Sequence, residues 1–337
     1  MPQLRQNAAT KEWVIIATER ANRPEDFQCI EEEETPEARK KCPFCPGNES
    51  KTPPEIFAYR AYGTKANTPG WWLRVTENKY PALSPSGNTT RKKDLEFFSS
   101  IDGYGQHEVL IETPDHDKTI ATLDQKQVEE IFLGYRDRYL ALSKDCKFEI
   151  ILIFKNHKVA AGTSLKHPHS QIVAVPITPM HIRTRLEEAM RYFDDHGECV
   201  FCAMLKKEKE AKERIILETD NFVVFCPFAS RSPFEMWVLP KKHNAAFIYA
   251  SVLETKELGF VMRQTLAKLH IALKDPAYNY VIKSAPCHED NIDYYHWFVE
   301  IEPRVVQVAG FELGSGIYIN TVLPEDAARF LREAQVS

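Results

Sequence analysis

Residues 166–176 read Lys-His-Pro-His-Ser-Gln-Ile-Val-Ala-Val-Pro, two histidines one residue apart that lead into an apolar run. In a strand, residues two positions apart point to the same face, so His167 and His169 are expected to project into one pocket. Pro168 lacks a backbone N–H, which suits the start or the edge of a strand. A pair of hydrogen-bonded structural histidines is the alternative interpretation, and the rest of the chain bears on the choice.

The composition describes a globular chain with room for a large core. Its 337 residues suffice for one large domain or two ordinary ones, and 43% of them are hydrophobic. The net charge is −5 and no basic run is longer than the triplet Arg91-Lys92-Lys93, so no surface for nucleic acid is expected. We find no secretory signal and no apolar stretch long enough to span a bilayer. These features predict a soluble, cytoplasmic protein with a small-molecule partner and neither a nucleic-acid nor a membrane partner.

Four of the eight cysteines occur as two C-x-x-C pairs, Cys42 with Cys45 and Cys199 with Cys202. In a long chain without a secretory signal, such pairs indicate metal knuckles or redox motifs rather than a disulfide framework. A redox motif opens a helix after a strand, whereas the first pair follows an acidic stretch and precedes a turn at residues 46–48. Metal binding, with zinc as the expected ion, is therefore favoured.

The hydrophobic pattern predicts strands and helices in a similar order in both halves of the chain. In the first half we expect strands at 13–17, 71–75, 107–112 and 148–154, a mobile loop at 84–94, and a helix over 123–144 that Asp124 could cap. A connector helix over 181–193 follows the histidine pair. In the second half we expect strands at 222–226, 235–239, 278–284 and 295–301 and a long helix over 253–273.

The spacing of the motifs indicates a duplicated domain. Cys199 follows Cys42 by 157 positions and His296 follows His167 by 129, so the two offsets differ by a loop-sized 28 residues. The predicted division is a catalytic domain at 1–178, a connector at 179–198 and a second domain at 199–337. Because the second half has Phe298 where the first has a histidine, the second half is expected to be mainly structural.

Each C-x-x-C pair needs two more ligands to complete a tetrahedral zinc site. The histidines available to the first pair are His107, His116, His157 and His167, and those available to the second are His196, His243, His270, His288 and His296. Position at a strand end favours His116 and His243.

If His167 binds the first zinc, His169 remains free on the same face of a metal-anchored strand. A neutral imidazole is a good nucleophile when its other ring nitrogen donates to a fixed acceptor. Gln171, two residues farther along that face, can donate to a phosphoryl oxygen. Attack of His169 on phosphorus would give a covalent intermediate and a ping-pong exchange. A zinc-stabilised, non-catalytic interaction module is the hypothesis from another class.

These residues resemble the galactose-1-phosphate uridylyltransferase family of the histidine-triad superfamily. The resemblance covers nearly the whole chain and rests on the segment around Arg20 and Arg23, the first C-x-x-C with residues 113–116, and residues 154–156, 167–171, 296–297 and 309–314. It implies an α+β fold of tandem duplicated histidine-triad-like domains, each a mostly antiparallel sheet with packed helices. It also implies a possible homodimer.

The resemblance implies a role for each matching residue. His169 would be nucleotidylated, and Gln171 would steady the intermediate. Two zinc ions per chain would be bound by Cys42, Cys45, His116 and His167 and by Cys199, Cys202, His243 and His296. Nucleotide or phosphate contacts would come from Arg20, Arg23, Asn78, Asn156 and Ser164, and a hexose contact from Glu312.

Two positions depart from the uridylyltransferase pattern. Ser170 stands where those enzymes have glycine and Phe298 where they have histidine, and both look more like the plant ADP-glucose phosphorylase branch. The family's galactose-contacting glutamine is not evident, and Tyr318 stands at about its place. The resemblance implies exchange of a nucleotidyl group between a nucleotide sugar and a hexose 1-phosphate, with UDP-glucose and galactose 1-phosphate as the first expectation. Adenylyl transfer from ADP-glucose to phosphate is the alternative.

Overall fold

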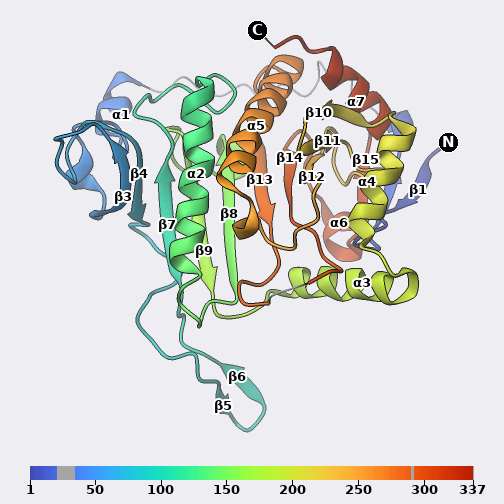
Figure 1. Cartoon of the computed structure of the whole chain (residues 1–337), viewed down its shortest axis with the longest axis horizontal. Helices are drawn as coiled ribbons and strands as arrows, with labels where there is room; N and C mark the ends of the chain where they lie inside the picture. The colour runs from blue at the N-terminus through green and yellow to red at the C-terminus, as the bar shows by residue number, and fades with distance from the viewer. Residues whose placement is uncertain (21–34, 290–291, 337) are drawn as a thin grey trace.

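A ten-stranded sheet runs through the computed structural model, which describes residues 1–20, 35–289 and 292–336 (Figure 1). Each pair of neighbouring strands is antiparallel. In spatial order the strands are β10 (Ile215–Glu218), β11 (Phe222–Phe225), β12 (Met236–Pro240), β14 (Phe298–Pro303), β13 (Tyr278–Lys283), β8 (Ile150–His157), β9 (His169–Val175), β7 (Gln106–Ile111), β4 (Trp71–Glu77) and β3 (Glu55–Arg60). The predicted α+β class with a mostly antiparallel sheet is confirmed.

The strands of the two halves join into one sheet through β8 and β13. These strands pair from Tyr278 opposite His157 to Ile282 opposite Ile153. The sequence did not predict this edge-to-edge contact, because the pattern of a strand does not identify its neighbour. The division of the chain at residues 178 and 199 stays a prediction.

Two long helices, α2 (Gln125–Leu142) and α5 (Val252–Leu273), lie side by side over one face of the sheet (Figure 1). The predicted cap of α2 is confirmed, since the Asp124 side chain accepts a hydrogen bond from a backbone N–H of the first turn. Gly259 lets the helices approach closely, because a Cβ there would lie 2.8 Å from the Cα of Glu129. The largest buried apolar cluster lies between these helices and the sheet.

The opposite face of the sheet differs between the two halves. In the second half it packs against α3 (Met180–His196) and α4 (Val200–Ala211), and Phe201 of α4 contacts Trp237 and Phe298 from the sheet. In the first half a smaller apolar cluster consists of Cys42, Phe44, Trp71, Val109 and Ile111. The histidine pair adjoins this smaller cluster.

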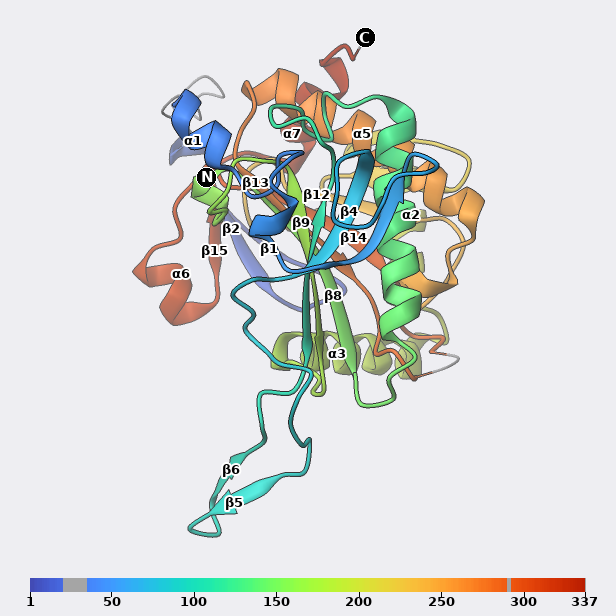
Figure 2. The ribbon, with the colours of Figure 1, turned by 90° about the vertical axis from the view of Figure 1, so that its left-hand side faces the viewer.

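Smaller elements surround the main sheet. A three-stranded sheet joins β1 (Gln3–Gln6), β2 (Trp13–Ile16) and β15 (Tyr318–Asn320), and the remaining helices are α1 (Pro36–Lys41), α6 (Gly310–Ser315) and α7 (Pro324–Glu333). The end of the segment predicted as a mobile loop, 84–94, forms β5 (Lys92–Asp94), which pairs with the following β6 (Phe98–Ser100) in a hairpin that projects from the body (Figures 1 and 2). Among the described residues, no helix has both the length and the apolar character to cross a bilayer.

Candidate active site

The predicted nucleophile begins β9, between β7 and β8. Burial alternates along this strand, so Ser170 faces the core under α2 while His169 and Gln171 share the other face. His167 lies just before the strand. The ring of Phe44 makes edge contacts with both imidazoles, at centroid distances of 6.1 Å to His167 and 5.2 Å to His169. The structure thus brings the two histidines together on one face, as the sequence pattern predicts.

Hydrogen bonds define the chemistry of His169. Its Nδ1 lies 2.8 Å from the backbone carbonyl oxygen of His167, which can only accept, so Nδ1 carries the proton. The lone pair therefore resides on Nε2. Burial lowers the pKa of His169 below its ordinary value, which keeps the ring neutral at pH 7. A neutral imidazole with a fixed Nδ1–H is the form that attacks an electrophile.

A buried ion pair supports this strand from the core side. Lys155 of β8 and Glu112, 2% and 0% exposed, form a contact of 2.6 Å between Nζ and Oε2. Lys155 Nζ also lies 3.3 Å from the carbonyl oxygen of His169, and the Ser170 hydroxyl donates to Glu112 Oε1 at 2.8 Å. A second hydrogen bond joins Ser170 to the Tyr135 hydroxyl at 2.5 Å. Ser170 therefore points away from His169 and anchors β9 to the ion pair.

The sequence reasoning did not find the roles of Lys155 and Glu112. Glu112 directly follows β7 and Lys155 lies in β8. A charged side chain at a buried position of an apolar strand is unusual unless it is paired with an opposite charge. That signal was available at Lys155, which directly follows the apolar run of residues 150–154 in the same strand. The partner could not be identified without the strand order.

Gln171 and Asn78 meet at the imidazole of His107. His107 Nε2 lies 2.8 Å from Gln171 Oε1 and 3.1 Å from Asn78 Nδ2. Asn78 directly follows β4, whereas His107 comes from β7. The structure thus places one predicted substrate contact beside the predicted catalytic glutamine.

The other predicted substrate residues lie in different surroundings. Asn156 Oδ1 accepts a hydrogen bond from Asn279 of the second half at 2.7 Å, and Ser164 is exposed in the loop before the histidine pair. Arg20 and Glu312 line a separate hollow of ≈300 Å³, together with Tyr318. Neither His169 nor Gln171 lines this hollow. The predicted contact at Arg23 lies outside the described residues.

The first metal cluster contains all four predicted ligands, Cys42, Cys45, His116 and His167, with donor atoms within 4.8 Å of one another. Cys45 Sγ lies 3.2 Å from His116 Nδ1 and 3.5 Å from His167 Nδ1, and the two nitrogens are 3.2 Å apart. Donors around a tetrahedral zinc lie about 3.3–3.8 Å apart, given bond lengths of about 2.0–2.3 Å.

The orientation of His167 also suits a metal ligand. Its Nε2 donates to the carbonyl oxygen of Thr113 at 2.8 Å, so Nδ1 presents its lone pair to the cluster. Burial lowers the pKa of His167 to about 4, so the ring is neutral at pH 7. The donor set of this cluster therefore fits zinc.

The second cluster brings together three of its four predicted ligands, Cys199, Cys202 and His243. Cys202 Sγ lies 3.3 Å from His243 Nδ1, and hydrogen bonds from Cys202 and His243 lower the pKa of Cys199 to about 5. His296 is not within the same 4.8 Å group, although its ring lies edge-on to His243 at 5.3 Å. Within the part of the chain that the structure describes, the buried Nε2 of His296 has no hydrogen-bond partner, so this nitrogen has an uncommitted lone pair.

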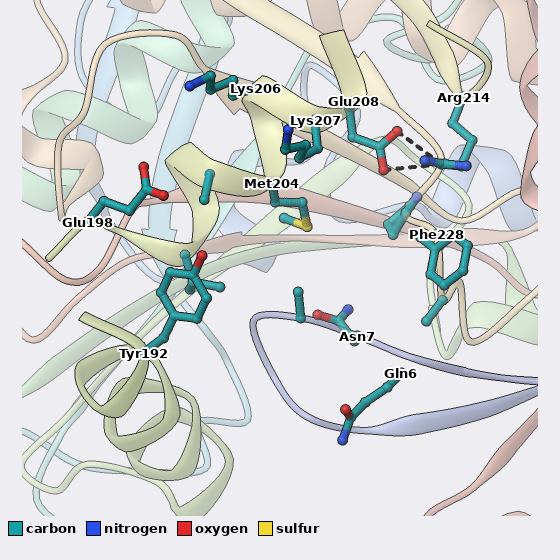
Figure 3. Close-up of a pocket in the computed structure, with 15 residues that line it drawn as sticks. Gln6, Asn7, Tyr192, Glu198, Met204, Lys206, Lys207, Glu208, Arg214 and Phe228 are labelled. Atoms are coloured by element: carbon teal, nitrogen blue, oxygen red, sulfur yellow. Dashed lines mark hydrogen bonds and ion pairs between the residues drawn. The ribbon is translucent and has the colours of Figure 1, made fainter. Parts of the chain in front are cut away.

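Another hollow of ≈360 Å³ opens beside α4 (Figure 3). Its walls include Tyr192, Met204 and Phe228, and Glu208 and Arg214 form an ion pair at one end. Among the described residues, none of those predicted from the sequence to bind substrate or metal lines this hollow. It is therefore distinct from the histidine site.

Comparisons with known proteins agree with the fold. A family model described as the N-terminal domain of galactose-1-phosphate uridyl transferase matches residues 1–179, and a model of a domain of unknown function matches residues 135–334. An ADP-glucose phosphorylase of Arabidopsis thaliana is 36% identical, covering 100% of this chain and 94% of that protein. A galactose-1-phosphate uridylyltransferase of Thermotoga maritima is 30% identical, covering 100% and 99%.

A solved structure gives the same result. The crystal structure of an ADP-glucose phosphorylase from Arabidopsis thaliana with bound ADP-glucose has a TM-score of 0.84 and 33% identity, with 100% of both chains covered. A histidine site on an antiparallel sheet with these relatives defines a nucleotidyltransferase. The chain belongs to the galactose-1-phosphate uridylyltransferase family.

Proposed function

We propose that this enzyme transfers a nucleotidyl group between a nucleotide sugar and a phosphate or hexose 1-phosphate, with His169 as the nucleophile. The observation that carries the proposal is the hydrogen bond from His169 Nδ1 to the carbonyl oxygen of His167, which leaves the lone pair on Nε2. The same carbonyl stabilises the positive charge that develops on the ring during attack.

The reaction consists of two displacements at one phosphorus. In the first, His169 Nε2 attacks the α-phosphorus, the bond to the bridging oxygen breaks, and hexose 1-phosphate leaves with that electron pair. In the second, an oxygen of the acceptor phosphate attacks the same phosphorus, and the P–N bond returns its electrons to Nε2. Gln171 can donate to a non-bridging oxygen in both steps without adding charge.

Two zinc ions per chain complete the proposal. The first would bind Cys42, Cys45, His116 and His167, and the second Cys199, Cys202 and His243 with His296 as the fourth ligand. A closed tetrahedral zinc supplies rigidity rather than a reactive water. His167 holds the backbone that accepts the Nδ1–H of His169, so the first cluster fixes the orientation of the nucleophile.

Two donor and acceptor pairs have comparable support. UDP-glucose with galactose 1-phosphate follows from the family and from the Thermotoga relative. ADP-glucose with phosphate follows from the Arabidopsis relative and from the structure with bound ADP-glucose. Intact-protein mass spectrometry after incubation with each donor alone distinguishes them, because only the true donor adds a uridylyl or adenylyl mass. A protein that gains no mass and releases no glucose 1-phosphate from either donor contradicts the proposal.

The predicted homodimer is supported by the distribution of predicted substrate contacts. Arg20 and Glu312 line a hollow that His169 does not line, so a second copy could bring this hollow to the histidine site. Light scattering at several concentrations tests this directly, and a monomer with full activity contradicts it. The cytoplasmic location stays a prediction.

A further inference from the structure

His107 belongs to the group around Gln171, although the reaction proposed above gives it no role. It lies on β7, the strand next to β9, where Val109 is directly opposite Gln171. Because side chains alternate along a strand, His107 is on the same face as Val109 and diagonally opposite Gln171. Its Nε2 lies 2.8 Å from Gln171 Oε1.

The backbone fixes which nitrogen of His107 carries the proton. The N–H of Ala82 lies 3.2 Å from His107 Nδ1 and can only donate, so Nδ1 is an acceptor. The ring proton of the neutral imidazole is therefore on Nε2. That N–H then donates to Gln171 Oε1, which identifies the oxygen of a side chain whose two ends are otherwise interchangeable.

The amide of Asn78 also approaches His107. The N–H of Tyr80 donates to Asn78 Oδ1 at 2.9 Å, so the amide atom 3.1 Å from His107 Nε2 is the nitrogen. With the ring proton on Nε2, this nitrogen and Nε2 are both donors and do not hydrogen-bond to each other. Gln171 Oε1, 2.8 Å from Nε2, is therefore the acceptor of the ring proton.

We propose that His107 is a positioning residue that orients the Gln171 amide, so that its NH₂ group is available to the transferred phosphoryl group. Without His107 the amide could turn over and present its oxygen to the phosphoryl oxygens, where two acceptors repel each other. The contribution is realised in the transition state, where negative charge on those oxygens needs a preorganised donor. This inference rests on the proposed nucleotidyl transfer through His169.

The first experiment compares His107→Leu with His107→Gln by rapid-quench measurement of nucleotidyl-enzyme formation. Leucine removes the donor, and we expect the rate to fall about 10- to 100-fold with KM changed less than about threefold. Glutamine places an N–H near the position of Nε2 and should restore most of the rate. Equal rates in wild type and His107→Leu would overturn the inference, as would equal losses in both variants.

A double-mutant cycle separates positioning from a direct contribution. Gln171→Ala removes the group that His107 orients, so His107→Leu should cost little further rate in that background. Independent, multiplicative losses would show that His107 does not act through Gln171.

If His107→Leu does not fold, substitutions at Ala82, whose backbone N–H contacts His107, test the inference instead. Ala82→Pro removes the N–H that fixes the tautomer, and Ala82→Ser keeps it. We expect about a threefold to tenfold loss of rate for proline and none for serine. Equal rates in these two variants count against the inference. Wild-type protein that forms no nucleotidyl-histidine from any donor contradicts the proposed function instead, so the two failures are distinguishable.

Discussion

The strands β9 and β14 present the same pattern with different chemistry. Each follows a histidine beside a C-x-x-C pair, and Phe298 stands two residues after His296 as His169 stands two residues after His167. The ring pair His116 and His167 has a centroid distance of 5.1 Å at 89°, close to the 5.3 Å and 80° of His243 and His296. The architecture around the metal clusters is therefore shared, and the difference lies on the strands themselves.

The outer face of β14 is filled at the position where the face of β9 carries His169, the proposed nucleophile. Phe298 stacks on Trp237 at 4.3 Å and lies under the guanidinium of Arg185 from α3, 5.7 Å from the ring centroid. Helices α3 and α4 cover this region. Phe298 therefore packs against neighbouring side chains at the position where β9 has His169.

The third positions of the two patterns differ in charge. Glu300 corresponds to Gln171 and forms an ion pair with Lys283 at 2.7 Å. Burial alone would raise the pKa of Glu300, but Lys283 and Arg185 outweigh burial and hold the pKa below its ordinary value. Gln171 instead accepts a hydrogen bond from His107 Nε2. Charge therefore stabilises the second half, while the first half keeps a neutral amide on the face of the proposed nucleophile.

The metal clusters give the largest expected effects. Cys45→Ser and Cys202→Ser should each lower the zinc content by about one ion per chain, measured by elemental analysis, and destabilise the protein strongly because a structural zinc contributes on the order of 10 kcal/mol. In folded protein, only Cys45→Ser should abolish nucleotidylation. Loss of nucleotidylation in folded Cys202→Ser would mean that the second half takes part in the chemistry.

Exchange of the central residue is the next test. His169→Ala should lower turnover by about 10⁴-fold or more and prevent any gain of nucleotidyl mass, since the nucleophile is removed. Phe298→Ala should keep the mass gain but lower the free energy of unfolding by about 3–5 kcal/mol, because it leaves a cavity under α3 and α4. Denaturant titration and intact mass measure both; a stable but inactive Phe298→Ala would break the comparison.

The third positions offer a smaller, reciprocal test. Gln171→Glu should slow nucleotidylation by about 10²–10³-fold with little change in unfolding free energy, because a carboxylate repels the phosphoryl oxygens. Glu300→Gln should leave the rate nearly unchanged but cost about 3 kcal/mol of stability by leaving Lys283 without its partner. If Glu300→Gln slows the reaction more than it destabilises the fold, the assignment of its charge to stability is wrong.

The sequence predicted what is local and missed what depends on neighbouring strands. Each C-x-x-C pair and the face shared by His167 and His169 follow from short spacings, which the backbone geometry converts directly into proximity. The histidine ligands of the first cluster lie 71 and 122 positions from Cys45, so spacing alone left several candidates and the full set was implied by the family resemblance. The bond between His107 and Gln171 joins residues 64 positions apart, on strands whose adjacency no pattern specifies. The junction of β8 with β13 was missed for the same reason.

Ser170 shows that a sequence difference beside the proposed nucleophile has two possible orientations. As a departure from the uridylyltransferase pattern it resembles the ADP-glucose phosphorylase branch, and its side chain was free to face either the substrate or the core. The structure turns its hydroxyl to Glu112 and Tyr135 on the core side of β9. Only the strand register separates these two interpretations, because a neighbour in sequence points to the opposite face.

Ser170→Gly gives the smallest expected effect. Removing the hydroxyl takes one hydrogen bond from the buried Glu112 carboxylate, so the unfolding free energy should fall by about 1–3 kcal/mol. The ratio of nucleotidylation rates with ADP-glucose and UDP-glucose should stay within about threefold of wild type, because the side chain does not face the nucleotide. Ser170→Ala is the control for the added flexibility of glycine. A change of preferred donor in both variants would show that β9 transmits the core contact to the nucleotide, and the separation of the two faces drawn here would no longer hold.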